Sequence, residues 1–376
     1  MLSVLLILIF IRPFISSLAF PYENFLYSQA LLGFLAIWII TKKISLSVKP
    51  GIKYALWLFV LALSASIVFS QDRLTSLQGL YQYTCGILLF IVVISLSPAH
   101  KDKIIRCILI AGVAISVLAI YQYFFGFPRL LAYINKQGAS DSFALDYITR
   151  KRPFFPFVTP NTLAGYLIML IPLALSYKNR IWLILPLFLA LLLTKSMGAL
   201  LSLFIALAIY LYLKGNPKKT GVFFLAGIII IMGYVFITRV ALQKIHAQPM
   251  FSAVMRLNYW QETLEIIKRH PLVGVGLGNF NLAYSRYAHN SYLQVWAEIG
   301  ILGVVSLLWL TVSGLKSSWK ALKDHSDKAQ LIGLITANIA FLIHNLVDFT
   351  FFLPEVSLIW WVVLGIAYSS YNHLHF

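Results

Sequence analysis

Apolar runs long enough to cross a membrane occupy most of this 376-residue chain, and they constrain its fold more than any other feature. A spanning helix needs about 20 apolar residues, because each residue rises 1.5 Å along the helix and the hydrocarbon core is roughly 30 Å thick. Of all residues, 60% are hydrophobic and only 11% are charged, whereas a soluble domain carries about 25% charged residues. The sequence therefore predicts an all-α polytopic membrane protein.

We predict about twelve transmembrane helices in a single membrane domain, residues 1–376. The runs are residues 2–20, 25–41, 52–70, 83–97, 104–125, 161–177, 181–194, 197–213, 221–238, 290–314, 330–350 and 356–372. The apolar stretch 181–213 is too long for one crossing. Because Lys195 and Gly198 interrupt it, we divide it into two helices. Arg12 and Pro13 in the first run predict that its outer half is kinked or interfacial.

Lysine and arginine residues in the short loops indicate the orientation, because cytoplasmic loops carry an excess of them. With the N-terminus in the cytoplasm, five basic loops are internal: those around residues 42–53, 101–106, 178–180, 214–219 and 316–328. We therefore expect both termini in the cytoplasm. Two long segments, 126–160 and 239–289, are then external loops.

The net charge of +18 would suit a nucleic-acid-binding protein, but the basic residues are spread over short loops, so no nucleic-acid partner is expected. Many basic residues fall on the external side, where topology disfavours them. They are Arg73, Arg129, Lys136, Arg150, Lys151, Arg152, Lys195, Arg239, Lys244, Arg256, Lys268, Arg269 and Arg286. A lipid or sugar phosphate at the outer leaflet is the partner that this set predicts, with Arg150, Arg152, Arg256 and Arg286 as candidate clamps.

The second external loop is expected to contain a helix over residues 253–269, which Pro271 follows. Leu257, Trp260, Leu264 and Ile267 recur on one face, while Arg256 and Tyr259 share a side. The apolar stripe predicts that this helix lies in the membrane interface.

Glycines at 274, 276 and 278 follow this helix. No strand precedes them, so a dinucleotide-binding turn is excluded. Two interpretations stay open: a tight connector whose backbone approaches the helices closely, or a nest of N–H groups that binds phosphate.

His289 begins the sequence His-Asn-Ser-Tyr-Leu at the outer end of the run 290–314. Titration near neutral pH suits it to general-base chemistry, and the alternative is a capping histidine. Glu298 lies inside the same predicted helix, where an acid is costly and by default functional or paired. Asp348 ends the run 330–350, with His344 four residues before it. A hydrogen bond between these two that fixes packing is the alternative to a catalytic role.

The chain resembles the O-antigen ligase and O-antigen polymerase family of bacterial membrane glycosyltransferases over roughly residues 150–372. The matching pieces are PNTLAGYLIMLIPLAL (160–175), TKSMGALLSL (194–203), RLNYW (256–260), HPLVGVGLGNF (270–280), HNSYLQVWAEIGILG (289–303) and HNLVDFTFFLP (344–354). The order of these pieces matches as well, since the large external loop comes just before the His-Asn-x-Tyr-Leu helix.

The resemblance implies a GT-C-like fold in the bacterial inner membrane, with the active site facing the periplasm. It implies metal-independent, inverting transfer of a glycan from undecaprenyl pyrophosphate to an acceptor hydroxyl, without a cofactor. The acceptor is lipid A-core in a ligase and another lipid-linked glycan in a polymerase; protein glycosylation is a third variant. Arg256 would hold the pyrophosphate and His289 would activate the acceptor, with Arg286, Tyr259, Asn290, Glu298 and Asp348 as further substrate-binding residues.

The sequence departs from the family in one place. Met197 stands where the family commonly has arginine. Our hypothesis is that Lys195 or Arg152 supplies the missing positive charge. From a different class of protein, a flippase for lipid-linked sugars stays the alternative. A transporter should show two corresponding halves with broken helices, and no such correspondence is visible here.

Overall fold

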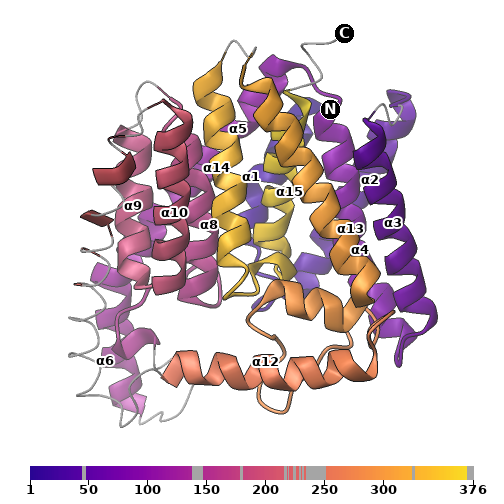
Figure 1. Ribbon diagram of the computed structural model, residues 1–376. Helices are drawn as coiled ribbons and strands as arrows, with labels where there is room; N and C mark the ends of the chain where they lie inside the picture. The colour runs from indigo at the N-terminus through magenta and orange to yellow at the C-terminus, as the bar shows by residue number, and fades with distance from the viewer. Residues whose placement is uncertain are drawn as a thin grey trace.

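The computed structural model describes residues 1–44, 48–137, 147–177, 181–215, 251–323 and 327–370, together with 218, 220–222, 226, 227, 230 and 233. Every regular element within these ranges is helical, and the long helices stand side by side as a bundle (Figure 1). The predicted all-α class is therefore confirmed for the described part of the chain.

The N-terminal half supplies α1 (Leu2–Ile11), a 3-10 turn (Arg12–Phe14), α2 (Pro21–Thr41), α3 (Pro50–Val68), α4 (Arg73–Ile94), α5 (Pro98–Tyr121), a π turn (Gln122–Gly126) and α6 (Phe127–Gln137). The C-terminal half supplies α8 (Pro160–Ala174), α9 (Ile181–Thr194), α10 (Met197–Leu213), α12 (Phe251–Arg269), α13 (Ser291–Ala321), α14 (Lys328–His344), a 3-10 turn (Thr350–Phe352) and α15 (Pro354–Ser369). Proline occupies the first turn of α2, α3, α5, α8 and α15, where its missing N–H costs nothing.

Five of the described helices are long and apolar enough to cross a membrane: Pro21–Thr41, Pro50–Val68, Arg73–Ile94, Pro98–Ile134 and Ser291–Ala321. Six shorter apolar helices accompany them, at Leu2–Phe14, Pro160–Ala174, Ile181–Thr194, Met197–Leu213, Lys328–His344 and Pro354–Ser369. The predicted run 221–238 lies largely outside the described residues. The chain is thus a multi-pass membrane protein, while the number of twelve crossings stays a prediction.

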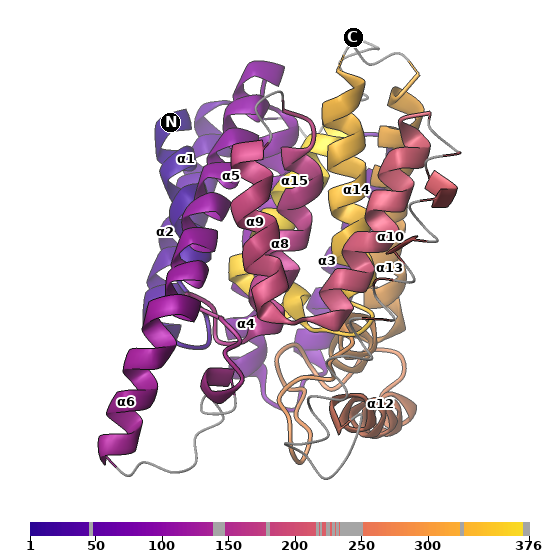
Figure 2. The ribbon, with the colours of Figure 1, turned by 90° about the vertical axis from the view of Figure 1, so that its left-hand side faces the viewer.

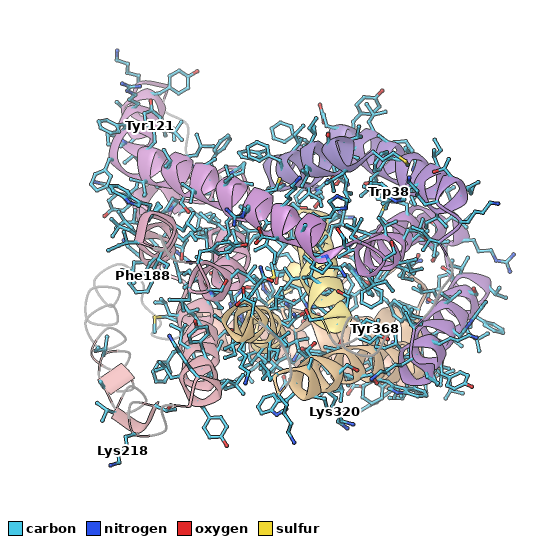
Figure 3. All side chains as sticks on the ribbon, turned by 90° about the horizontal axis from the view of Figure 1, so that it is seen from above. Trp38, Tyr121, Phe188, Lys218, Lys320 and Tyr368 are labelled. Carbon is cyan, nitrogen blue, oxygen red and sulfur yellow. The ribbon has the colours of Figure 1, made fainter. Side chains whose placement is uncertain are left out.

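Helix α15 forms the centre of the bundle, seen end-on in Figure 3. Every residue of α15 is buried, and so is nearly every residue of α8. Trp360 and Trp361 are among the largest fully buried side chains. Gly86 lets α4 approach Trp361 so closely that a Cβ atom at position 86 would overlap the indole. Small residues at such contacts allow close packing where lipid supplies no hydrophobic drive.

The two ends of the bundle differ. The start of α1 and the end of α15 lie at one end, whereas α12 runs across the opposite end (Figures 1 and 2). The starts of α8 and α10 and the end of α14 also lie at the α12 end. Helix α6 continues from α5 beyond the bundle at this end, so the segment 126–160 begins as a helix.

The first predicted run does not form one membrane-length helix. Helix α1 ends at Ile11, and Arg12 opens a 3-10 turn. The expected kink is therefore confirmed, and the alternative of an interfacial position stays a prediction. Arg12 itself is only 1% exposed. Its guanidinium lies 3.5 Å from the carboxylate of Glu355 and 4.7 Å from the ring centre of Tyr27. A buried arginine needs such a partner inside the bundle.

Helix α13 is not the continuous span expected from run 290–314. Gly300 breaks it with φ 78° and ψ −177°. The N–H of Ile301 donates to the carbonyl of Pro271, so the loop before α13 takes over a hydrogen bond that a straight helix would make internally. Residues before Gly300, including Glu298, therefore belong to a separate helical segment at the α12 end.

The predicted helix in the second long loop is confirmed as α12. Its expected apolar stripe divides between two environments. Ile267 is buried against Phe280 and its neighbours, while Leu257 and Leu264 are exposed. The exposed pair gives this helix an outward apolar side, consistent with a position at the membrane surface.

Candidate functional site

His289 stands at the junction between the long loop and α13. Its backbone has φ 51°, a left-handed conformation that is uncommon for a residue with a side chain and is often found at functional sites. The imidazole stacks on Tyr259 of α12 at 5.5 Å and meets Phe349 edge-on at 4.8 Å. The indole N–H of Trp260 donates to the His289 carbonyl at 3.4 Å. Helix α12 thus fixes both the backbone and the ring of His289.

The surroundings of His289 favour its neutral form. Burial is the main cause that lowers its pKa below the usual 6.5. The carboxylate of Asp348 raises the pKa, and the guanidinium of Arg256 lowers it. Because only a neutral imidazole can accept a proton, this environment suits a general base at neutral pH.

Asp348 supplies a buried carboxylate beside this histidine. The residue is 1% exposed. Its Oδ1 accepts a hydrogen bond from the N–H of Phe349 at 2.8 Å. Its Oδ2 has no hydrogen-bond partner among the described residues, and neither does Nδ1 of His289. Buried polar atoms are nearly always paired, so open positions of this kind are typical of a site that awaits substrate or water.

Arg256 of α12 brings a positive charge to the same place. It is half-buried, and its charge acts on both His289 and His344. Tyr259 lies three residues further along α12, so the face that carries the arginine also carries the ring stacked on His289. The structure therefore brings Arg256, Tyr259, His289 and Asp348 together.

A second group of basic residues surrounds the turn between α9 and α10. Arg152 donates from Nε to the carbonyl of Thr194 at 2.8 Å and from Nη2 to Oδ1 of Asn161 at 3.0 Å. Nζ of Lys195 donates to the carbonyl of Arg150 at 2.8 Å. Arg152 and Lys195, the two proposed substitutes for the missing family arginine, therefore lie at one turn, beside the starts of α8 and α10. Helix starts favour anions.

Lys195 is held in a strained and electropositive position. Its φ is 54°. Burial lowers the pKa of its ammonium, and the neighbouring charges of Arg152, Lys151 and Arg150 lower it further. A bound anion at this turn would oppose the lowering of the Lys195 pKa, because its negative charge would neutralise the repulsion among the cations.

Thr159 caps α8, since its Oγ1 accepts from the N–H of Thr162 at 3.1 Å. The side chain of Asn161 is left to accept from Arg152.

The glycine run is a connector that packs against α13. Its N–H groups are used within the chain: Gly274 donates to His270, Val275 to Ala297, and Gly276 to the carbonyl of Glu298. At Gly274, with φ +73°, a Cβ atom would overlap the backbone of Glu298. Of the two interpretations of this run, these contacts support the connector, because the N–H groups that a phosphate nest would use already have partners.

Glu298, Asn290 and Arg286 have environments different from that of His289. Glu298 is 3% exposed and accepts hydrogen bonds from the Gly278 N–H at 2.8 Å and from Gln294 at 2.9 Å. The side chain of Asn290 caps α13 through the N–H groups of Tyr292 and Leu293. Arg286 is exposed on the loop. The contacts of Glu298 and Asn290 hold the local fold, and their predicted roles in substrate binding are untested.

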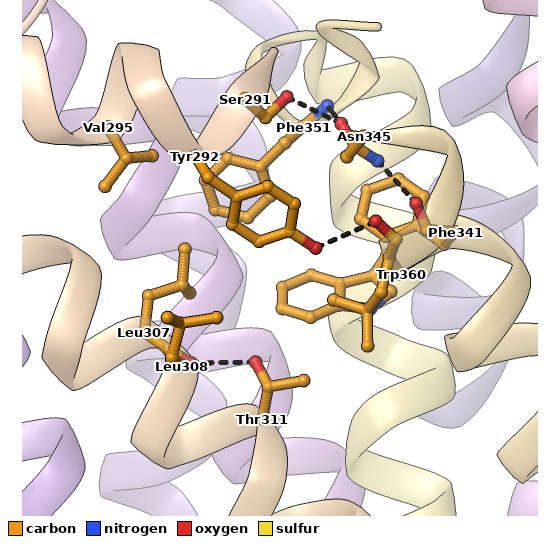
Figure 4. A pocket seen from close by; sticks show the side chains of 11 residues that line it. Ser291, Tyr292, Val295, Leu307, Leu308, Thr311, Phe341, Asn345, Phe351 and Trp360 are labelled. Atoms are coloured by element: carbon orange, nitrogen blue, oxygen red, sulfur yellow. Dashed lines mark hydrogen bonds between the residues drawn. The ribbon is translucent and has the colours of Figure 1, made fainter. Parts of the chain in front are cut away.

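A small apolar pocket opens next to this site, between α13, α14 and α15 (Figure 4). Ser291 and Asn345 form its end nearest His289, and Tyr292 reaches across it to donate to the carbonyl of Leu342 at 2.8 Å. The cavity measures about 10 Å³, roughly the space that one water molecule needs. It is too small for a sugar.

His344 is buried at the end of α14, four residues before Asp348. The sequence leaves open a packing hydrogen bond with Asp348 and a catalytic role, and both ring nitrogens are buried without a hydrogen bond to a described residue. Tyr287 also belongs to the site, because its ring stacks on Phe349 at 4.1 Å, and burial raises its pKa to about 12. The i, i+4 spacing of His344 and Asp348 was the available signal; nothing in the sequence indicated the partner of Tyr287.

These features define a multi-pass helical membrane protein with a buried His, Asp and Arg group at one end of its bundle. Residues 181–308 match the family model described as O-antigen ligase. This match covers less than half of the chain and supports the O-antigen ligase and polymerase family that the sequence resembles. Members of that family are glycosyltransferase-like enzymes. The match includes Lys195, Arg256 and His289, and it is narrower than the expected region 150–372. No curated protein matches the chain.

Proposed function

We propose that this protein is a membrane glycosyltransferase that moves a glycan from undecaprenyl pyrophosphate to an acceptor hydroxyl at the end of the bundle that carries α12. The single observation that carries this proposal is the convergence of His289, Arg256 and Asp348 within and beside the O-antigen ligase domain. In this proposal the end faces the periplasm, because the distribution of basic residues predicts that it is external and the family resemblance implies the bacterial inner membrane.

In the proposed reaction, the acceptor oxygen attacks the anomeric carbon while the bond to the pyrophosphate oxygen breaks. Neutral His289 takes the acceptor proton, a step worth about 10²–10⁴-fold. Arg256, with Lys195 and Arg152 at the α9–α10 turn, stabilises the negative charge that develops on the leaving pyrophosphate. One displacement predicts inversion at the anomeric carbon. None of these steps requires a metal ion or a cofactor.

Ligase and polymerase activities differ in the acceptor, which is lipid A-core for a ligase and a second lipid-linked glycan for a polymerase. The pocket beside His289 is too small to hold either acceptor, so it does not discriminate between them. We favour the ligase, in keeping with the description of the matched domain.

The test uses purified protein in nanodiscs with an undecaprenyl-pyrophosphate-linked glycan. Release of undecaprenyl pyrophosphate is measured with no acceptor, with lipid A-core, and with excess lipid-linked glycan. Release that requires lipid A-core and is lost in His289→Ala supports the ligase. Release that increases with excess lipid-linked glycan, without lipid A-core, identifies a polymerase. Movement of the donor across the bilayer without release, unchanged in His289→Ala, would contradict the transferase and favour a flippase.

A further inference from the structure

His344 ends α14 at the site and is enclosed by three other elements. It is 1% exposed. A Cβ atom added to Gly165 of α8 would lie 2.9 Å from Cδ2 and 3.0 Å from Nε2 of its ring. Gly198 of α10 approaches the opposite side, 3.8 Å from Nδ1 on the same construction. The starts of α8 and α10 therefore close directly on this imidazole, and glycine at both positions makes room for it.

The carboxylate of Asp348 lies close to the ring of His344. Nε2 of His344 lies 4.0 Å from Oδ2 of Asp348. This separation exceeds hydrogen-bond length by about 1 Å, so a small shift of the turn that carries Asp348 would complete the bond. The positive charge of Arg256 also acts on the ring, and so do the backbone groups of Asn161 and Gly198. Both Oδ2 and Nε2 lack hydrogen bonds to described residues.

Asp348 lies 4.0 Å from His344, its charge also acts on His289, and the two histidines have different exposure. His289 keeps part of its surface accessible, and its buried nitrogen is Nδ1. His344 is sealed inside the bundle. The accessible histidine suits contact with an acceptor, whereas the sealed one can act only through a neighbour, of which Asp348 is the carboxylate within 4.0 Å. In a catalytic triad, a carboxylate orients the histidine that acts as base. Here His289 would be the base, Asp348 the carboxylate, and His344 a further donor that orients the carboxylate.

We propose that His344 is a positioning residue of the transfer reaction: its Nε2–H donates to Oδ2 of Asp348 and holds this carboxylate toward His289. This inference rests on the proposed function. When His289 accepts the acceptor proton, Asp348 stays ionised and stabilises the imidazolium, and His344 stays a neutral donor. No proton passes to Asp348, so the charges balance within the step described above.

The test compares His344→Gln with His344→Met in the release assay. The two side chains are unbranched and close in size, but only glutamine offers an N–H near the position of Nε2. We expect Met to lower kcat roughly 10–100-fold, as is typical when a residue that orients a working group is lost, with KM for the donor within about twofold. Glutamine should restore at least a third of the wild-type kcat.

Asn338→Ala serves as the matched control, because Asn338 is a buried polar residue on α14 away from the site. It should leave kcat near the wild-type value. Equal losses in the Gln and Met variants, or equal losses in Met and Asn338→Ala, would overturn the proposal. If the Met variant does not fold, Gly165→Ala replaces it, since its Cβ displaces the ring and should lower kcat without changing KM. Wild-type protein that releases no undecaprenyl pyrophosphate would instead refute the proposed function itself.

Discussion

Glu298 and Asp348 are two buried carboxylates at the same end of the bundle, and the chain treats them in opposite ways. Both oxygens of Glu298 accept hydrogen bonds, from Gly278 and from Gln294. Only one oxygen of Asp348 does so, and the other lies 4.0 Å from His344. The two residues are almost equally inaccessible, at 3% and 1% exposure.

This difference shows that the burial of a carboxylate does not by itself indicate a functional role. A buried carboxylate with satisfied oxygens stabilises the structure around it, here the glycine run and the break at Gly300. A buried carboxylate with an open oxygen costs free energy in the resting protein, because the desolvation is uncompensated. Such a cost is typical of a site that is completed by substrate. We therefore expect substitutions near Asp348 to reduce activity and substitutions near Glu298 to reduce stability.

The largest effect is expected at His289. Alanine there should lower kcat by about 10²–10⁴-fold, because the acceptor proton loses its base. Release of undecaprenyl pyrophosphate measures the effect. His270→Ala, at the other end of the same loop, is the control and should keep most of the activity. Loss of activity in His270→Ala to the same extent would show that the loop tolerates no change, and the assignment of His289 as base would lose its support.

Gly300→Ala tests whether the region around Glu298, where α13 is broken, contributes to stability. With φ +78°, Gly300 allows a conformation that alanine adopts only with strain, and its Cβ would overlap the backbone at Leu272. We expect a loss of about 1–3 kcal/mol in stability, seen as a lower midpoint of thermal unfolding. Gly33→Ala, where a Cβ meets no atom within 4 Å, should leave the midpoint unchanged or raise it. The same midpoint in both variants would contradict the account of the break in α13.

Lys195→Met should raise KM for the donor roughly tenfold, because a charged hydrogen bond to phosphate contributes about 1.5–3 kcal/mol, and kcat should change less. The lowered pKa of Lys195 has a further consequence. Its ammonium loses the proton at a lower pH than an ordinary lysine, so donor KM should rise toward alkaline pH. In Lys195→Arg this alkaline rise should disappear. A donor KM that is independent of pH in the wild type would exclude Lys195 from the phosphate site.

The smallest expected effect is a shift of the pH profile. Since burial lowers the pKa of His289, the acid limb of kcat/KM should lie below pH 6.5. Asp348 opposes this by raising the pKa, so Asp348→Asn should move the limb of the remaining activity to still lower pH. A limb that moves upward, or does not move, would mean that Asp348 does not act on the base.

Much of this structure could be predicted because its signals are local. The apolar runs predicted the membrane helices, and the apolar residues that recur on one face from Leu257 to Ile267 predicted α12. Met197 stands where the family commonly has arginine, and this departure led to the hypothesis that Lys195 or Arg152 replaces the missing charge. The structure places both residues at one turn. These inferences needed only periodicity, composition and neighbouring residues.

The remainder depends on contacts between distant segments. The break at Gly300 exists because residues 271–276 pack against α13, and a single glycine in an apolar run carries no sign of that contact. The ion pair of Arg12 with Glu355 could not be predicted, because the two residues are 343 positions apart in the chain. The surroundings of His344 could not be predicted for the same reason: Gly165 and Gly198, which enclose it, belong to other helices.

The most direct test of the central claim measures Asp348→Asn and Glu298→Gln side by side, for kcat by release of undecaprenyl pyrophosphate and for the midpoint of thermal unfolding. Asp348→Asn should lose kcat roughly 10²-fold and keep its midpoint. Glu298→Gln should keep kcat in the folded protein and lose about 1–3 kcal/mol of stability, because an amide cannot accept from both Gly278 and Gln294. Equal loss of kcat in both variants, or a stable and fully active Asp348→Asn, would contradict the distinction between the two carboxylates.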